Sequence, residues 1–240
     1  MSIVGGRQMT KNFAVIPARG GSKRIPRKNI REFSGIPAIS RTIDFVLSTG
    51  IFSELIVSTD DHEIAELSMA AGATFIVNRS DVLSSDFVPT VPVIADALRS
   101  FDSRASQVSF VCCIYPVNPF LDSVNLIRGL DILKNNVSIN YVNPIVSYPY
   151  PIDRALQFDS SGIIQMLNPL HLETRSQDLG DYVHDAGQWY WGRGETWLRE
   201  ASLLTNSMGL LVPRWVSQDI DTLEDWQYAE LLFDIQKAKK

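Results

Sequence analysis

A basic segment near the N-terminus carries the residues with the clearest potential for chemistry. Between Arg19 and Arg31 lie six lysine and arginine side chains and no acidic one, although the whole chain of 240 residues holds only 22 such cations. Gly20 and Gly21 lie within this segment, and glycine lets a ligand approach the backbone closely. Cations beside such glycines are typical of a loop that binds phosphate groups. The segment therefore predicts a polyphosphate site, with an exposed basic turn or an RNA contact as the alternatives.

Known motifs and the overall charge narrow the kind of ligand. The chain contains neither the GxxxxGK[ST] pattern of P-loop proteins nor the GxGxxG pattern of dinucleotide-binding folds. A net charge of −5 argues against broad binding of nucleic acid or of an anionic membrane. No apolar stretch approaches the roughly 18 residues of a membrane span, and the first residues lack the pattern of a secretory signal. We expect a soluble, cytoplasmic protein.

Two acidic residues near the C-terminus form a second candidate group. Asp219 and Asp221 are two positions apart, so on an extended segment their side chains project from the same face and can share one divalent cation. Mg²⁺ suits hard oxygen ligands that act together with substrate phosphates. Asp221 or Thr222 could instead cap the helix that follows. Because a metal would complement the basic loop, we predict that Asp219 and Asp221 bind Mg²⁺.

Other reactive side chains give weaker signals. Asp60 and Asp61 follow a predicted buried strand and precede a helix, where helix capping and a functional role fit equally well. Cys112 and Cys113 are adjacent within an apolar run, and we interpret them as buried core residues rather than as a nucleophile or a disulfide framework. The three histidines lack metal-ligand spacing, so the sequence gives no support for zinc.

The elements that must position these residues alternate along the chain. Phe13–Pro17 is predicted to be a buried strand that runs directly into the basic loop, and a helix follows from Ile39 with a stop at Gly50. Further strands are predicted at 55–57, 74–77, 108–114, 139–146, 188–191 and 210–212, and further helices at 61–71, 92–101, 122–134, near 195 and at 223–239. Repeated strand–helix units indicate a parallel sheet, at whose strand ends a phosphate ligand would bind.

Two segments depart from this alternation. Residues 1–12 show no periodicity and resemble a disordered leader. Residues from about 147 to 186 begin with the proline- and aromatic-rich Tyr148–Pro151 and have no sustained period, which indicates an inserted arm. We therefore expect one domain over residues 13–240, with three α/β layers and a mostly parallel sheet.

Several motifs resemble those of the acylneuraminate cytidylyltransferases, which activate sialic-acid-like sugars and related 2-keto acids as CMP conjugates from CTP. These motifs are IPARGGSKRIPRKNI at 16–30, VSTDD at 57–61 and DID at 219–221. SYPYPIDR at 147–154, TRSQD at 174–178 and HDAGQ at 184–188 look most like the pseudaminic acid branch of this family. The resemblance covers the chain from Asn12 to the final helix and implies a Rossmann-like nucleotidyltransferase domain.

The resemblance also implies roles for individual residues. The nucleotide would be held by Ala18, Arg19, Gly20, Gly21, Ser22, Lys23, Lys28, Asn29 and Arg79. Arg19, Lys23 and Asp221 would act in catalysis, with Lys23 bearing on the charge that develops in the transition state. The acceptor sugar would contact Tyr115, Asn118, His184, Asp185 and Gln188. Mg²⁺ would be the cofactor, and the arm would pack against a second subunit in a homodimer.

Two departures from the sialic acid pattern bear on the choice of sugar. YPVNPFLD at 115–122 stands where those enzymes carry QPTSPLR, and Ala186-Gly187 stands where they carry Asn-Gly. Since these positions face the sugar in the family, they argue against N-acetylneuraminate. We expect transfer of CMP from CTP to a nine-carbon 2-keto sugar acid, pseudaminic acid, with legionaminic acid, N-acetylneuraminate or 3-deoxy-octulosonate as alternative acceptors. A non-catalytic protein that binds nucleotides or phosphate is the alternative from another class.

Overall fold

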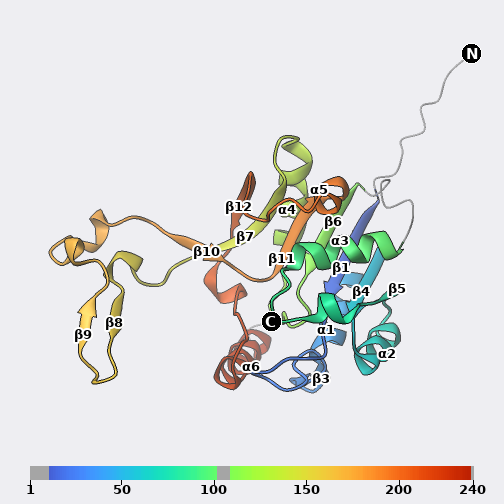
Figure 1. Ribbon diagram of the computed structural model, residues 1–240, viewed down its shortest axis with the longest axis horizontal. Coiled ribbons are helices and arrows are strands. Elements are labelled where there is room, and N and C mark those ends of the chain that lie inside the picture. The colour runs from blue at the N-terminus through green and yellow to red at the C-terminus, as the bar shows by residue number, and fades with distance from the viewer. Residues whose placement is uncertain (1–10, 102–108, 239–240) are drawn as a thin grey trace, which may run out of the picture.

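The computed structural model describes residues 11–101 and 109–238, and the predicted alternation of strands and helices forms its frame (Figure 1). The strands of the main sheet are β1 (Asn12–Pro17), β4 (Glu54–Thr59), β5 (Phe75–Asn78), β6 (Phe110–Ile114), β7 (Tyr141–Ser147), β10 (Val183–Asp185), β11 (Trp189–Arg193) and β12 (Ser207–Leu211). The helices are α1 (Ala38–Ser48), α2 (His62–Ala70), α3 (Thr90–Phe101), α4 (Ser123–Asn135), α5 (Gly194–Leu198) and α6 (Leu223–Ala238).

The sheet has the strand order β10-β7-β11-β6-β1-β4-β5, and β12 pairs with β7 beside this path. The run β6-β1-β4-β5 is parallel, as the strand–helix alternation predicts. β11 lies antiparallel between β6 and β7, because the chain returns from the arm in the opposite direction. The parallel run places the C-terminal ends of β1, β4 and β6 at one edge, where the basic loop begins.

Helices cover both faces of the sheet and give the expected three layers. Alternate residues of β1 enter different core clusters: Ala14 and Ile16 pack with α1, α2 and α4, whereas Phe13 and Val15 pack with α3 and α5. The two cysteines of β6 follow the same rule, since Cys112 joins the first cluster and Cys113 the second. Both thiols are free and fully buried, and burial raises the pKa of each. The interpretation of the pair as core residues is confirmed.

Several boundaries differ from those predicted. β1 begins at Asn12, whose side-chain amide donates to the Ile51 carbonyl (3.0 Å); residues 1–10 of the predicted leader lie outside the described residues. α3 begins two residues earlier than predicted and β12 three residues earlier. Val108 and Lys239, the predicted ends of a strand and of the last helix, lie outside the described residues.

The arm projects away from the sheet (Figure 1). Its root is a ladder in the main sheet, where Val183 of β10 pairs with Ser147 of β7. Beyond the root the chain forms a hairpin of β8 (Leu156–Phe158) and β9 (Ile164–Met166). Phe158 and Ile164 of this hairpin are exposed. The arm therefore presents apolar side chains outside the core of its own chain.

A second small hairpin was not predicted. β2 (Glu32–Phe33) and β3 (Ile36–Pro37) follow the basic loop, and Phe33 packs edge-on against Trp226 of α6. Ile25 of the loop and Ile220 are buried in the same cluster. This cluster ties the basic loop to the segment that carries Asp219 and Asp221, although nearly 200 residues separate them in sequence. No helix in the described part of the chain is long and apolar enough to cross a membrane.

Candidate active site

The basic loop begins where β1 ends and is fixed first by its backbone. The amide of Ala18 donates to the carbonyl of Ser58 (2.9 Å), which continues the pairing of β1 with β4. The side-chain amide of the buried Asn29 donates to the backbone carbonyl of Arg19 (2.8 Å) and thereby closes the loop on itself. The side chains between these anchors are presented at the C-terminal edge of the sheet.

The N-terminus of α2 fixes the same loop from the other side. Asp60 accepts the backbone amide of Gly20 (2.8 Å), and a Cβ atom on Gly20 would lie 2.6 Å from Asp61 Oδ2. Asp61 caps α2 by accepting the amide of Ile64 (3.0 Å) and also pairs with Arg27. This hydrogen bond and ion pair with the guanidinium of Arg27 lowers the pKa of Asp61. Asp61 is therefore a helix cap, and both carboxylates hold the loop in place.

The six cations of the basic segment divide into two groups. Arg27 adopts a left-handed conformation (φ 57°) and turns onto α2, where it also pairs with Glu63. The guanidinium of Arg31 lies over the ring of Trp226, 5.3 Å from its centroid. The other four cations, Arg19, Lys23, Arg24 and Lys28, line one cavity of about 750 Å³. Ser22 and Asn29 line it too, whereas Ala18, Gly20 and Gly21 shape the loop behind it.

Acidic residues from distant parts of the chain line the same cavity. Asp221 pairs with Arg24 (2.8 Å) and Lys28 (3.4 Å), and Asp86 pairs with Arg19 and Lys23. Asp219 and Asp185 also face this space. The cavity thus holds four cations, each paired with a carboxylate that the local sequence of the basic loop does not reveal.

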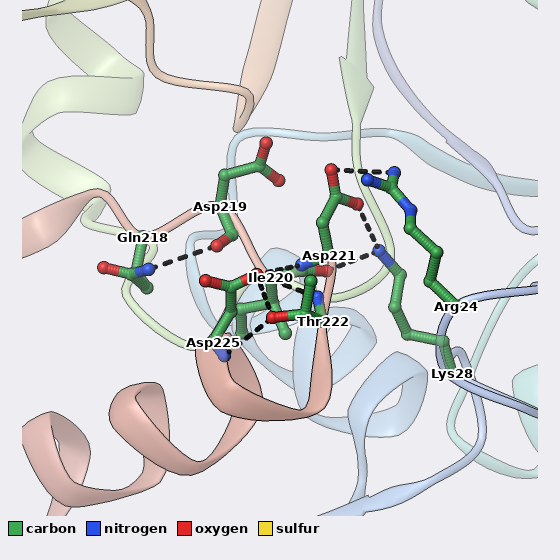
Figure 2. Close-up of polar contacts among 8 residues, drawn as sticks. All are labelled: Arg24, Lys28, Gln218, Asp219, Ile220, Asp221, Thr222 and Asp225. Carbon is green, nitrogen blue, oxygen red and sulfur yellow. Dashed lines mark hydrogen bonds and ion pairs between the residues drawn. The ribbon is translucent and has the colours of Figure 1, made fainter. Parts of the chain in front are cut away.

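Asp219 and Asp221 project to the same side, as their spacing predicts (Figure 2). Ile220 between them points the other way into the core, and its carbonyl accepts the ammonium of Lys28 (2.6 Å). Partial burial and the nearby charge of Asp221 raise the pKa of Asp219. Two carboxylates that repel each other at the edge of a cavity form a set of hard oxygen donors for a divalent cation.

Helix capping does not occupy these carboxylates. The Thr222 hydroxyl accepts the amide of Asp225 (3.2 Å), while Asp225 Oδ2 accepts the amide of Thr222 (2.8 Å), so these two residues form a reciprocal capping box for α6. Asp225 also accepts the amide of Asp221 (3.1 Å). Of the two capping alternatives, Thr222 is correct, and the Asp221 carboxylate remains directed into the cavity.

A second cavity of about 940 Å³ adjoins the first. Tyr115, Asp185 and Tyr190 line both cavities. Tyr190 donates its hydroxyl to Asp185, and the hydroxyls of Tyr115 and Thr90 lie 2.7 Å apart. Burial raises the pKa of Tyr115 to about 12, so this phenol stays protonated near neutral pH. The boundary between the cavities therefore carries neutral hydroxyl groups and one carboxylate.

The predicted sugar-binding residues separate into two groups. Tyr115, His184 and Asp185 line the second cavity, where the ring of His184 lies 4.8 Å from that of Tyr148. The side chains of Asn118 and Gln188 are instead buried and hydrogen-bonded to each other (3.3 Å), and neither lines either cavity.

Arg79 also lies behind the predicted nucleotide cavity rather than in its wall. It is buried against β4, where it donates to the Ser58 side chain (3.1 Å) and to the Ser58 carbonyl (2.6 Å). Because Ser58 also accepts the amide of Ala18, Arg79 supports the strand end from which the basic loop departs.

Three cavity residues were missed by the sequence reasoning. Arg24 was part of the basic segment but could not be separated from its neighbours without a structure. Tyr190 lies on β11, but it lines both cavities whereas Gln188, two residues earlier, lines neither, so strand alternation from the predicted site residue would not have found it. Asp86 lies in an irregular segment before α3, and nothing in its local sequence indicates a role.

An α/β fold with a basic loop and an acidic pair facing one cavity is typical of a nucleotidyltransferase. The chain belongs to the cytidylyltransferase family, whose model matches residues 13–156. It is 37% identical over 226 residues to the pseudaminic acid cytidylyltransferase of Campylobacter jejuni, covering 94% of this chain and 97% of the relative. It is 29% identical to the CMP-N,N'-diacetyllegionaminic acid synthase of Legionella pneumophila, again covering 94% and 97% of the two chains.

Solved structures show the same fold. A CMP:2-keto-3-deoxy-manno-octonic acid synthetase complexed with CTP matches with a TM-score of 0.68 over 95% of this chain and 100% of the other, at 14% identity. A 4-diphosphocytidyl-2C-methyl-D-erythritol synthase from Anaerococcus prevotii matches with a TM-score of 0.63 over 94% and 99%, at 15% identity. The Rossmann-like fold predicted from the sequence is confirmed.

Proposed function

We propose that this protein transfers CMP from CTP to the anomeric hydroxyl of a nonulosonic acid, pseudaminic acid, and releases pyrophosphate. The observation that carries the proposal is the single cavity that Arg19, Lys23, Arg24 and Lys28 share with Asp219 and Asp221. A triphosphate needs such a concentration of cations. The choice of sugar follows the Campylobacter jejuni relative, which covers nearly the whole chain at 37% identity.

The acidic pair supports Mg²⁺ as the metal. Asp219 and Asp221 project to the same side (Figure 2). Partial burial and, after it, repulsion from Asp221 raise the pKa of Asp219, and a cation would relieve that repulsion. Two carboxylates leave most of an octahedral coordination shell to phosphate oxygens and water, which is typical of Mg²⁺ with nucleotides. When bound, the metal would neutralise charge on the phosphates.

In the proposed reaction, the anomeric oxygen bonds to the α-phosphorus and the bond from that phosphorus to the bridging oxygen breaks. The hydroxyl proton passes to water, and pyrophosphate leaves with the electron pair of the broken bond. Arg19 and Lys23 would hold the departing phosphates, where negative charge grows most. The Lys23 side chain is 80% exposed and so is free to follow the phosphates as they separate.

The acceptor would bind where the two cavities meet, at Tyr115, Asp185 and Tyr190. Protonated phenols can donate to sugar oxygens, and the rest of the second cavity includes Val91, Ile145 and Leu203. Such apolar side chains suit acyl methyl and deoxy groups better than a fully hydroxylated chain. This preference supports a diacylated deoxy sugar acid over N-acetylneuraminate or 3-deoxy-octulosonate.

The exposed apolar residues of the arm support a homodimer in which the arm of each subunit packs against the other. Phe158 is 79% exposed and Leu170 88% exposed in the isolated chain. Apolar surfaces of this kind are typical of interaction sites. Because CTP is an intracellular metabolite, we also propose that the enzyme acts in the cytoplasm.

The proposal is tested by measuring the rate of pyrophosphate release for each combination of a nucleotide with a sugar acid. CTP with pseudaminic acid should give the highest rate, and legionaminic acid should be the best of the other acceptors. Lys23→Ala and Asp221→Asn should each lower turnover by about 10²-fold or more. Lys134→Ala, on an exposed position of α4, is the matched control and should retain the parent rate. Binding of CTP without product from any sugar acid would favour the non-catalytic alternative instead.

A further inference from the structure

Asp86 occupies the part of the cavity in which the proposed function requires phosphate oxygens. Its Oδ1 pairs with the guanidinium of Arg19, and its Oδ2 pairs with the ammonium of Lys23. One carboxylate therefore bridges the two cations, with one oxygen on each. These two contacts also lower the pKa of Asp86, with the Lys23 hydrogen bond as the largest cause.

The chemistry of this bridge resembles that of a phosphate group on the same two cations. A carboxylate offers two oxygens that share one negative charge, whereas a triphosphate offers several oxygens and a larger charge. Arg19 and Lys23 cannot direct all their donors to both partners at once. Asp86 and a bound triphosphate would therefore compete for these cations.

Few contacts hold the segment that carries Asp86, so this segment can move away from the cavity. It lies between a single 3₁₀ turn (η1, Asp81–Ser84) and the start of α3 at Thr90. Phe87 next to it is 94% exposed. Within the described residues, the backbone of 85–88 makes only local hydrogen bonds, from Phe87 to the Ser85 hydroxyl (3.4 Å) and from Val88 to the Ser85 carbonyl (3.3 Å). Breaking the two ion pairs would therefore disturb little else.

We propose that Asp86 is a positioning residue that competes with phosphate for two cations: it holds Arg19 and Lys23 over the cavity and is displaced when CTP binds. This inference rests on the proposed function, because it assumes that the nucleotide enters this cavity. It adds that competition from Asp86 makes CTP bind more weakly than the cations alone would allow. The benefit to the protein is that these two cations are kept close to their working positions before the substrate arrives.

The size of the competition follows from the exposure of the partners. The side chains of Arg19, Lys23 and Asp86 are 35%, 80% and 30% exposed, and solvent screens ion pairs of this kind. Each such pair changes an equilibrium by about two- to five-fold at most. Because two pairs are lost, removing the charge of Asp86 should tighten CTP binding by roughly 4- to 25-fold.

Titration calorimetry of CTP, with Mg²⁺ and without acceptor, tests the inference on the full chain. Asp86→Asn keeps the size of the side chain but removes its charge, and its dissociation constant for CTP should fall by the stated factor. Asp86→Glu restores the charge and should return the constant toward that of the parent. Asp81→Asn, an exposed acid in the same segment, is the matched control and should bind CTP as the parent does.

Unchanged or weaker CTP binding by Asp86→Asn would overturn the inference. So would a loss of turnover at saturating CTP with a shifted Mg²⁺ requirement, because that result would make Asp86 a ligand of the bound substrate or metal. If the parent itself fails to bind CTP, the proposed function fails together with the inference. If the parent binds CTP and Asp86→Asn gains nothing, only the role of Asp86 is refuted.

Discussion

The two glycines of the basic loop should respond very differently to the same substitution. A Cβ atom on Gly20 would lie 2.6 Å from Asp61 Oδ2 and 3.0 Å from Asp61 Cβ, whereas one on Gly21 would meet no atom within 4 Å. Asp61 cannot easily move aside, because it caps α2 and pairs with Arg27. Gly20→Ala must therefore displace the loop itself, while Gly21→Ala fits the loop without movement.

The expected magnitudes follow from this geometry. A contact of 2.6 Å is roughly 1 Å shorter than an ordinary one, and overpacking of this kind costs about 1–3 kcal/mol. For a chain of this size the cost corresponds to a fall in melting temperature of about 2–12 °C. Misplacing the cations by about 1 Å should lower kcat/KM for CTP by about 10²-fold. Gly21→Ala should leave stability within about 1 kcal/mol of the parent and raise only the KM for CTP, where phosphate approaches the backbone.

Thermal denaturation and pyrophosphate release on the two variants together provide the assay. Alanine also restricts the unfolded chain and can thereby stabilise the folded protein by up to about 1 kcal/mol. Because Gly21→Ala makes no close contact, its melting temperature reports this effect alone. A Gly20→Ala variant as stable and as active as Gly21→Ala would refute the conclusion that the N-terminus of α2 fixes the loop.

Two further substitutions test the supports of the site. Asp61→Asn keeps a capping side chain but removes its charge. Because the folded-state pKa of Asp61 is lowered, the charge should contribute about 1 kcal/mol to stability at pH 7, and this contribution should vanish as the pH falls below about 4 through that pKa. In urea denaturation the variant should therefore lose more stability at pH 7 than at pH 3, and equal losses would mean that the pair with Arg27 contributes nothing. Tyr190→Phe removes the hydroxyl that donates to Asp185, so the KM for the sugar acid should rise by about 5- to 30-fold while the KM for CTP stays unchanged. Steady-state kinetics with both substrates varied measure the two constants. A change in the KM for CTP alone would contradict the proposed acceptor site.

Local patterns in the sequence were sufficient to predict the central fold and one half of the site. The buried strand at 13–17, the basic loop after it and the spacing of Asp219 and Asp221 each depend on neighbours in the chain, so their geometry follows from strand and helix periodicity. The antiparallel placement of β11 depends instead on the path of a long arm, which has no period of its own.

The acids that complete the cavity could not be predicted for a similar reason. Asp86 reaches Arg19 and Lys23 only through the tertiary fold, and its own segment is irregular. Asn118 and Gln188 were expected to face the sugar, but the structure buries their side chains against each other. Whether a polar side chain on a loop or strand end points into a cavity or into the protein is decided by packing that no local pattern encodes.

A crystal structure of the enzyme with CTP and Mg²⁺ tests the central claim most directly. The triphosphate should lie between the basic loop and the acidic pair, with phosphate oxygens on Arg19 and Lys23 and the metal on Asp219 and Asp221. Nucleotide bound in the second cavity or elsewhere, with the four cations still paired to their own carboxylates, would contradict the account.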